Sequence, residues 1–451
     1  MEEKARSGTP ADEPRDVSRI CDKPDSEMVG AVYEMLDKQK DKNIPVQSRK
    51  NCISVLGSDP VLSGKIKFNT LSNRKNVEGA LPWNKAEELR DWTNIDTEYL
   101  IFYMEEYYSL NCDKKILSAL ELVADANKFN PFIDMLNSVV WDGKPRIENL
   151  LTDYLGVEKS EYSTQCMRLL MLGAICRAFR PGAKFDYILV LTGPQGIGKS
   201  TFFMKVCGNE DWYLENLNSI TRDKEAAELL LGKIIVEFNE LLAARGSVER
   251  VKAFVTVKAD EYRGAYAREK EKHKRTCVFV GTTNDMQFLV DKTGNRRFLP
   301  VKCGVVPAKK SLFADDETVQ NEFKQAWAEA YHIYKSENGK PSLVMPEKLQ
   351  GYIEDLQEDF KEDDPMVGMI QYWLDTHNYD YVCNKQIASE VLKVDDPDRR
   401  LLNQITDIMN NSIAGWTRTG KKKFFPGMGR QKCYVKTRDF TEAYQEQIPF
   451  K

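Results

Sequence analysis

The stretch Gly193-Pro194-Gln195-Gly196-Ile197-Gly198-Lys199-Ser200 decides the fold class of this chain. It fills every fixed position of the pattern G-x-x-x-x-G-K-[ST], in which glycines let backbone N–H groups close around phosphates. A predicted strand, the apolar run YILVL at residues 187–191, precedes it, and a predicted amphipathic helix follows from Thr201. Because a helix N-terminus favours anions, the stretch predicts a P-loop that binds ATP. Lys199 is expected to reach the β- and γ-phosphates, and the Ser200 hydroxyl to hold Mg²⁺.

More short apolar runs follow the P-loop. They are KIIVEF at residues 233–238, TCVFVG at 276–281 and RFLPV at 297–301, with helical segments between them. Strands that alternate with helices are typical of a parallel α/β sheet. We therefore predict an α/β core around the P-loop.

Hydrolysis requires an acid at the tip of a neighbouring strand, and the second run offers Glu237 and Glu240. Strand alternation puts the two on opposite faces. We favour Glu240 as the acid that polarises water or assists Mg²⁺, because it lies at the strand end where open α/β sheets bind ligands. Glu237 stays as the alternative. If the third run lies between the P-loop strand and the acid strand, Asn284 at its tip is a candidate for positioning water.

A Gly-Asn turn and two arginines, Arg296 and Arg297, follow. Either guanidinium could reach a phosphate bound to a neighbouring subunit, as an arginine finger does.

The composition is that of an ordinary soluble protein. The chain has 451 residues, 42% of them hydrophobic and 30% charged, with a net charge of -4. No window approaches the apolar length of a membrane span. Residues 1–27 lack the apolar segment of a secretory signal, so we expect a cytoplasmic protein with no membrane partner.

Positive charge is concentrated in two segments. Residues 258–275 are mainly basic, and residues 414–436 carry seven basic residues and no acid. Local basic patches on a mildly acidic chain indicate a polyanion held at defined places. The second patch, which includes Lys421, Lys422 and Lys423, is a candidate for DNA binding.

Five segments are expected along the chain. Residues 1–26 are predicted to be a disordered tail, because they contain few apolar residues. Residues 27–160 are predicted to form a mainly helical collar or loading domain, although residues 50–68 contain strand-like runs. The ATPase domain is expected at 161–310, a helical and acidic linker at 311–364, and a unit with the outline of a winged helix at 365–451. That outline is two helices, 385–392 and 399–409, followed by strands at 416–418 and 432–436.

The order of these motifs resembles superfamily 3 helicases, and more closely the virulence-associated protein E family of prophages and pathogenicity islands. The carrying segments, in order along the chain, are residues 141–147 (WDGKPRI), 193–201, 236–241, 262–268, 279–284 and 291–298. The resemblance implies an AAA+-like ATPase core that forms a ring, expected to be a hexamer, and moves along single-stranded DNA. It implies a channel hairpin that contacts DNA. That role falls on Lys258, Arg263, Tyr266, Arg268, Lys272 and Lys274.

The resulting expectation is an ATP- and Mg²⁺-dependent DNA helicase. It would start replication of a phage, prophage or pathogenicity island. Its expected partners are single-stranded DNA, duplex DNA and replication-initiation proteins. Two alternatives remain open: a P-loop switch or defence ATPase, and an origin-binding protein without unwinding activity.

Overall fold

The computed structural model describes residues 21–215, 217, 224–239, 247–262, 270–284, 295–359 and 365–437. The chain forms two compact units. The first comprises residues 1–239, 253–282 and 301–345, and the second comprises residues 240–252, 283–300 and 346–451. Within the described residues, no helix is both long and apolar enough to cross a bilayer.

The first unit begins with a mixed α and β segment. Its elements are α1 (Ser26–Glu34), α2 (Arg49–Ser58), β1 (Ile66–Asn69), β2 (Arg74–Val77), β3 (Arg90–Asp91), α3 (Asn94–Tyr108), α4 (Asp113–Ala126) and β4 (Lys128–Phe129). The strands form one sheet in the order β3-β2-β1-β4. Leu56, Ile66, Leu100 and Leu120 are buried in a core that these helices and strands share.

This segment has more helical than strand residues, and it also contains a four-stranded sheet that the sequence does not predict. Residues 49–58 form a helix where a strand-like run is expected. Ser48 caps that helix by accepting a hydrogen bond from the backbone of Asn51 at 3.1 Å, and Val55 and Leu56 are fully buried. Gly57 is accommodated in the last turn, where helical glycine costs least. Residues 1–20 of the predicted tail lie outside the described residues, and Cys21 is already buried.

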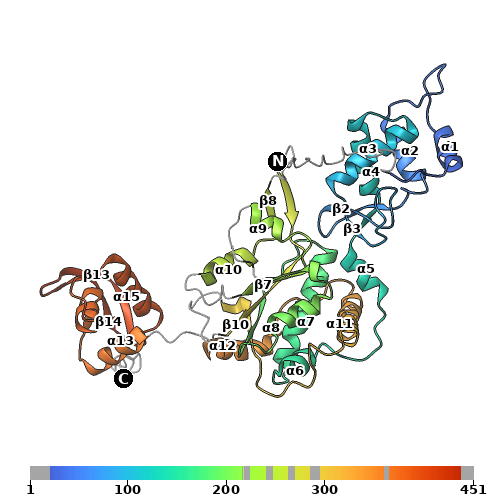
Figure 1. Cartoon of the computed structure of the whole chain (residues 1–451). Coiled ribbons are helices and arrows are strands. Elements are labelled where there is room, and N and C mark those ends of the chain that lie inside the picture. Colours follow the sequence, from blue (N-terminus) through green and yellow to red (C-terminus); the bar gives the residue numbers. More distant parts are fainter. Residues whose placement is uncertain are drawn as a thin grey trace, which may run out of the picture. The chain divides into compact units, whose positions relative to one another are not determined.

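A five-stranded sheet forms the centre of the first unit (Figure 1). Its strands are β5 (Ile188–Thr192), β6 (Tyr213–Leu214), β7 (Ile235–Asn239), β10 (Val278–Thr283) and β11 (Phe298–Lys302). Their order is β11-β5-β10-β7-β6, and β7 is parallel to both β6 and β10. The four predicted apolar runs are all strands of this sheet, and β10 lies between β5 and β7 as expected. The sheet confirms the predicted α/β core.

The other helices of this unit are α5 (Pro131–Ser138), α6 (Leu150–Leu155), α7 (Glu161–Phe179), α8 (Lys199–Cys207), α9 (Lys224–Leu229) and α11 (Asp316–Ser336). Helix α10 (Ser247–Val255) is divided between the two units. Helix α5 packs against α7 and α11, and α6 packs against α7 and α8. The sequence assigned α5 and α6 to the N-terminal domain and α11 to a linker, whereas their contacts place all three with the α/β core. A separate hairpin consists of β8 (Ala259–Tyr262) and β9 (Glu271–Lys274).

The second unit contains α12 (Gln350–Asp359), α13 (Pro365–Thr376), β12 (Tyr381–Cys383), α14 (Asn384–Glu390), α15 (Arg399–Asn411), β13 (Trp416–Phe425) and β14 (Gly429–Lys436). The three strands are antiparallel in the order β12-β14-β13. Trp373, Ile405, Trp416 and Tyr434 meet in their shared core. The two predicted helices and both predicted strands are present. The structure adds α13 and β12 and extends the strands into a long hairpin.

Candidate nucleotide-binding site

The P-loop lies between the end of β5 and the start of α8. Gly198 has a φ of 88° and caps α8, and Gly193 has a φ of 142°. A Cβ atom on Gly193 would lie 2.8 Å from the carbonyl oxygen of Cys303. Both positions therefore require glycine, for conformation at Gly198 and additionally for space at Gly193.

The chain that leaves β11 supports the start of this loop. The backbone N–H of Cys303 donates to the carbonyl of Thr192 at 2.8 Å, and the Thr192 hydroxyl donates to Val301 at 3.3 Å. Thr192 is fully buried. The first turn of the loop is thus fixed to a buried strand, which keeps its N–H groups in one arrangement.

The Lys199 ammonium lies inside the loop. Its Nζ donates to the carbonyl oxygens of Gly193 at 2.8 Å and Pro194 at 2.9 Å, and the side chain is buried. Burial lowers the pKa of Lys199, although Cys303 and Glu237 oppose that shift. A cation that has already lost much of its water is ready to exchange carbonyl partners for phosphate oxygens.

The carboxylate of Glu237 lies beside the P-loop serine. It is fully buried on β7 and accepts a hydrogen bond from Ser200 Oγ at 2.8 Å. The hydroxyls of Thr282 on β10 and Tyr213 on β6 also donate to it. Burial and the nearby carboxylate raise the pKa of Tyr213, so its phenol remains a donor at neutral pH. The arrangement places a fixed acid and a serine hydroxyl together, which are the groups that hold Mg²⁺ in P-loop enzymes.

This geometry bears on the choice between the two acids. Glu237, the alternative at the sequence level, is the acid that contacts Ser200. Glu240, the favoured candidate for the acid and metal roles, lies outside the described residues. The choice between the two acids for the metal role therefore stays a prediction, and the contact with Ser200 is shown for Glu237 alone among the described residues.

Sequence reasoning missed Tyr213 and Thr282 as partners of this acid. Tyr213 belongs to a two-residue strand without an apolar run, so no periodicity marks it. Thr282 directly follows the predicted strand at 276–281, but only Asn284, two residues later, is predicted to act in the site. One signal could have identified Thr282: it is a polar residue that directly follows an apolar strand, at the end where the sheet binds ligands.

Asn284 and the arginine pair belong to the second unit. Asn284 is exposed and directly follows β10. Arg296 is exposed and Arg297 half-buried in a short 3-10 helix, Asn295–Arg297. Gln357 supports this helix, because its Nε2 donates to the carbonyls of Asn295 at 2.9 Å and Phe298 at 2.7 Å.

The expected channel segment forms the β8–β9 hairpin. Lys258, Lys272 and Lys274 are exposed there. The Lys272 ammonium lies 3.7 Å from the Glu261 carboxylate, so this candidate DNA contact also forms an ion pair within the hairpin. The other three candidates, Arg263, Tyr266 and Arg268, lie outside the described residues.

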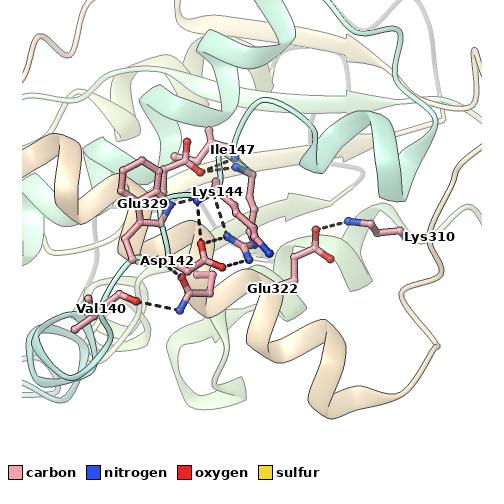
Figure 2. A network of polar contacts seen from close by, with 10 residues as sticks. Val140, Asp142, Lys144, Ile147, Lys310, Glu322 and Glu329 are labelled. Carbon is pink, nitrogen blue, oxygen red and sulfur yellow. Dashed lines mark hydrogen bonds and ion pairs between the residues drawn. The ribbon is translucent and has the colours of Figure 1, made fainter.

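Residues 141–147 are fixed on α11 by a polar network (Figure 2). Glu329 Oε2 accepts from the backbone N–H groups of Arg146 at 2.6 Å and Ile147 at 3.1 Å. The Arg146 guanidinium donates two parallel hydrogen bonds of 2.7 Å to Asp142, which hold the pKa of that carboxyl well below its usual range. The motif is therefore a folded structural loop.

The same helix is linked to the segment after β11. Lys310 binds Glu322 on α11 (Figure 2) and lies 3.3 Å from Asp153. The Tyr154 hydroxyl also donates to Glu322, at 2.7 Å. The segment after β11 therefore contacts α11 as well as the start of the P-loop.

Comparison with known proteins identifies the family to which this chain is similar. Residues 136–362 match the model of the virulence-associated protein E-like domain. No curated protein matches the chain. Among solved structures, the A form apo structure of the NrS-1 C-terminal region is 14% identical, with 87% of this chain and 100% of that chain covered and a TM-score of 0.48. A second apo structure of that region is 13% identical, with coverages of 83% and 96% and a TM-score of 0.44.

Proposed function

The chain belongs to the virulence-associated protein E-like family, and from that premise we propose that it is an ATP-driven DNA helicase. It is a ring-forming P-loop ATPase of the superfamily 3 type, expected to be a hexamer. Its role is to start replication of a phage, prophage or pathogenicity island. The observation that carries the proposal is the hydrogen bond of 2.8 Å between Ser200 and the buried Glu237 beside the P-loop.

The site divides the work of hydrolysis among its residues. The loop N–H groups and Lys199 bind the phosphates of ATP, and Ser200 with Glu237 holds Mg²⁺. Bound Mg²⁺ neutralises charge on the β- and γ-phosphates. Asn284 orients the attacking water, and Arg297 or Arg296 acts on the site of a neighbouring subunit.

Two parts of the chain serve DNA. The exposed lysines of the β8–β9 hairpin contact single-stranded DNA in the ring channel. Residues 365–437 are proposed to be a winged helix, and their order of helix, strand, two helices and hairpin, with strand order β12-β14-β13, supports this proposal. This unit contacts DNA and positions the ring where replication starts.

Strand displacement tests the proposal. The purified chain, given ATP and Mg²⁺, is expected to separate a forked duplex with a single-stranded tail, and the Lys199→Ala protein is expected to leave it paired. Both proteins are first compared by thermal melting to establish that the variant is folded. ATP hydrolysis without strand separation would instead fit a switch ATPase, and DNA binding without hydrolysis would fit an origin-binding protein.

A further inference from the structure

The β13–β14 hairpin has two faces of different character. In the antiparallel register, Lys422 pairs with Lys432 and Phe424 pairs with Arg430. Directly paired residues project to the same face, and neighbours along a strand project to opposite faces. These four side chains therefore share one face, which we call the outer face.

The opposite face is occupied by the rest of the unit. Lys423 Nζ lies 3.9 Å from the ring centroid of Tyr381 on β12. The buried Phe425 contacts the same ring edge-on, with centroids 5.5 Å apart. Lys423, a candidate DNA contact at the sequence level, is thus engaged with Tyr381, whereas Lys422 lies on the outer face.

The outer face is exposed to solvent. Phe424 is 67% exposed, and Lys422, Arg430 and Lys432 are all exposed beside it. The outer face thus combines three positive charges with an accessible phenyl ring. Its charge complements a polyanion, and its ring offers a flat apolar surface on which a base can stack.

Charge separates this face from the nearby helix α15. Three acids, Asp395, Asp396 and Asp398, precede that helix, whereas residues 414–436 contain seven basic residues and no acid. Arg399 and Arg400 at the start of α15 offset two of these three acids, whereas no acid offsets the positive charge of the hairpin, which attracts phosphates. The hairpin is therefore the part of the unit suited to a nucleic acid backbone.

We propose that the outer face of the hairpin binds DNA that contains unpaired bases. Lys422, Arg430 and Lys432 contact the phosphates, and Phe424 stacks on one base. The phenyl ring selects the substrate, since an unpaired base presents a free face, whereas bases within a duplex are already stacked on each other. This inference rests on the proposed function only in that the chain acts on DNA.

The test compares two DNAs of the same sequence. A 20-nucleotide single strand carrying the fluorescent base 2-aminopurine and the matching blunt duplex are titrated with the full chain at low salt and without nucleotide. Phe424→Ala is expected to weaken single-strand binding about tenfold and duplex binding less than twofold. It is also expected to lose part of the stacking-induced quenching of 2-aminopurine.

Three further variants make the outcome specific. Phe424→Trp keeps an aromatic face and is expected to retain binding and quenching. Lys422→Ala is expected to weaken both DNAs and to lower the salt dependence, because one phosphate contact is lost. Phe313→Ala is the matched control: it removes a phenyl that is 77% exposed but lies beside Asp315 and Asp316, and it should change neither titration.

Equal losses for single strand and duplex in Phe424→Ala would overturn the stacking role, as would no loss in either. Binding that prefers the duplex throughout would assign the face to paired DNA instead. ATP hydrolysis by the wild-type chain is measured separately. If the chain does not hydrolyse ATP but the titrations give the expected pattern, the proposed function is refuted and this DNA site is retained. If the chain hydrolyses ATP but the titrations do not give that pattern, this DNA site is refuted and the proposed function is retained.

Discussion

The carboxylate of Glu237 receives hydroxyl hydrogen bonds from three elements, so its position depends on residues far apart in the chain. Glu237→Gln keeps the shape of the side chain but removes the negative charge that we propose holds Mg²⁺. We expect ATP still to bind and hydrolysis to fall about 100-fold or more. Binding of a fluorescent ATP analogue and release of phosphate measure the two effects. The comparison is Glu240→Gln, and a fully active Glu237→Gln beside an inactive Glu240→Gln would reverse the assignment.

Tyr213 acts on that acid as a positioning residue. Tyr213→Phe removes the hydroxyl donor to a buried carboxylate and is expected to lower the free energy of unfolding by about 1.5–3 kcal/mol. It should also raise the Mg²⁺ concentration needed for half-maximal hydrolysis, because Glu237 is less well held.

Tyr154→Phe is a matched control for Tyr213→Phe, since it removes a phenol bound to Glu322 instead. It should lower stability without shifting the Mg²⁺ requirement. The same Mg²⁺ shift in both variants, or in neither, would mean that Tyr213 serves folding alone.

Single residues were predictable only where their role is local. The P-loop glycines, Lys199 and Ser200 are recognised because the motif is contiguous and its backbone geometry is self-contained. The choice between Glu237 and Glu240 depends on which side chain meets α8 across the sheet, which no local pattern contains. Tyr213 was missed for the same reason.

At the scale of elements, Arg275 fixes the base of the β8–β9 hairpin. The side chain is buried, and its Nε and Nη2 donate to the Asp260 carboxylate at 2.7 and 2.8 Å. The guanidinium carbon lies 4.2 Å from the ring centroid of Phe254. Arg275→Ala is expected to lower the free energy of unfolding by about 3 kcal/mol, because the half-buried Asp260 loses its partner and the buried guanidinium is removed. Urea denaturation measures this loss.

A double variant tests whether the loss of the Arg275–Asp260 ion pair causes the loss of stability. Arg275→Ala combined with Asp260→Ala should lose less stability than the sum of the two single variants. Strict additivity would show that Arg275 stabilises the hairpin through its contacts with the ring and carbonyl of Phe254, and not through Asp260.

Elements were predictable where burial is continuous. Strands β5, β7, β10 and β11 are apolar runs, so they stand out from the polar segments between them. Helix α2 was hidden because Gly57 and Pro60 look like breakers, although Gly57 occupies only its last turn. Helix α11 was separated from the core by sequence distance, and its contacts with α5 and α7 appear only in three dimensions.

At the scale of the whole molecule, a ring with shared active sites has a testable consequence. If Arg297 acts on a neighbour, Arg297→Ala protein should bind ATP but hydrolyse little. Mixing it with Lys199→Ala protein should restore some hydrolysis, because mixed rings contain interfaces with an intact P-loop and an intact arginine. The rate of phosphate release is compared with the sum of the two separate proteins. No gain, once mixed oligomers are shown to form, would mean that the arginine acts within its own chain or not at all.

The rate of ATP hydrolysis with and without single-stranded DNA tests the proposed helicase most directly. We expect Mg²⁺-dependent hydrolysis by the wild-type chain, a several-fold higher rate when single-stranded DNA is added, and no hydrolysis by a folded Lys199→Ala variant. Hydrolysis that persists in Lys199→Ala would contradict the assignment of the site. A wild-type rate that single-stranded DNA leaves unchanged would contradict a motor that moves along it.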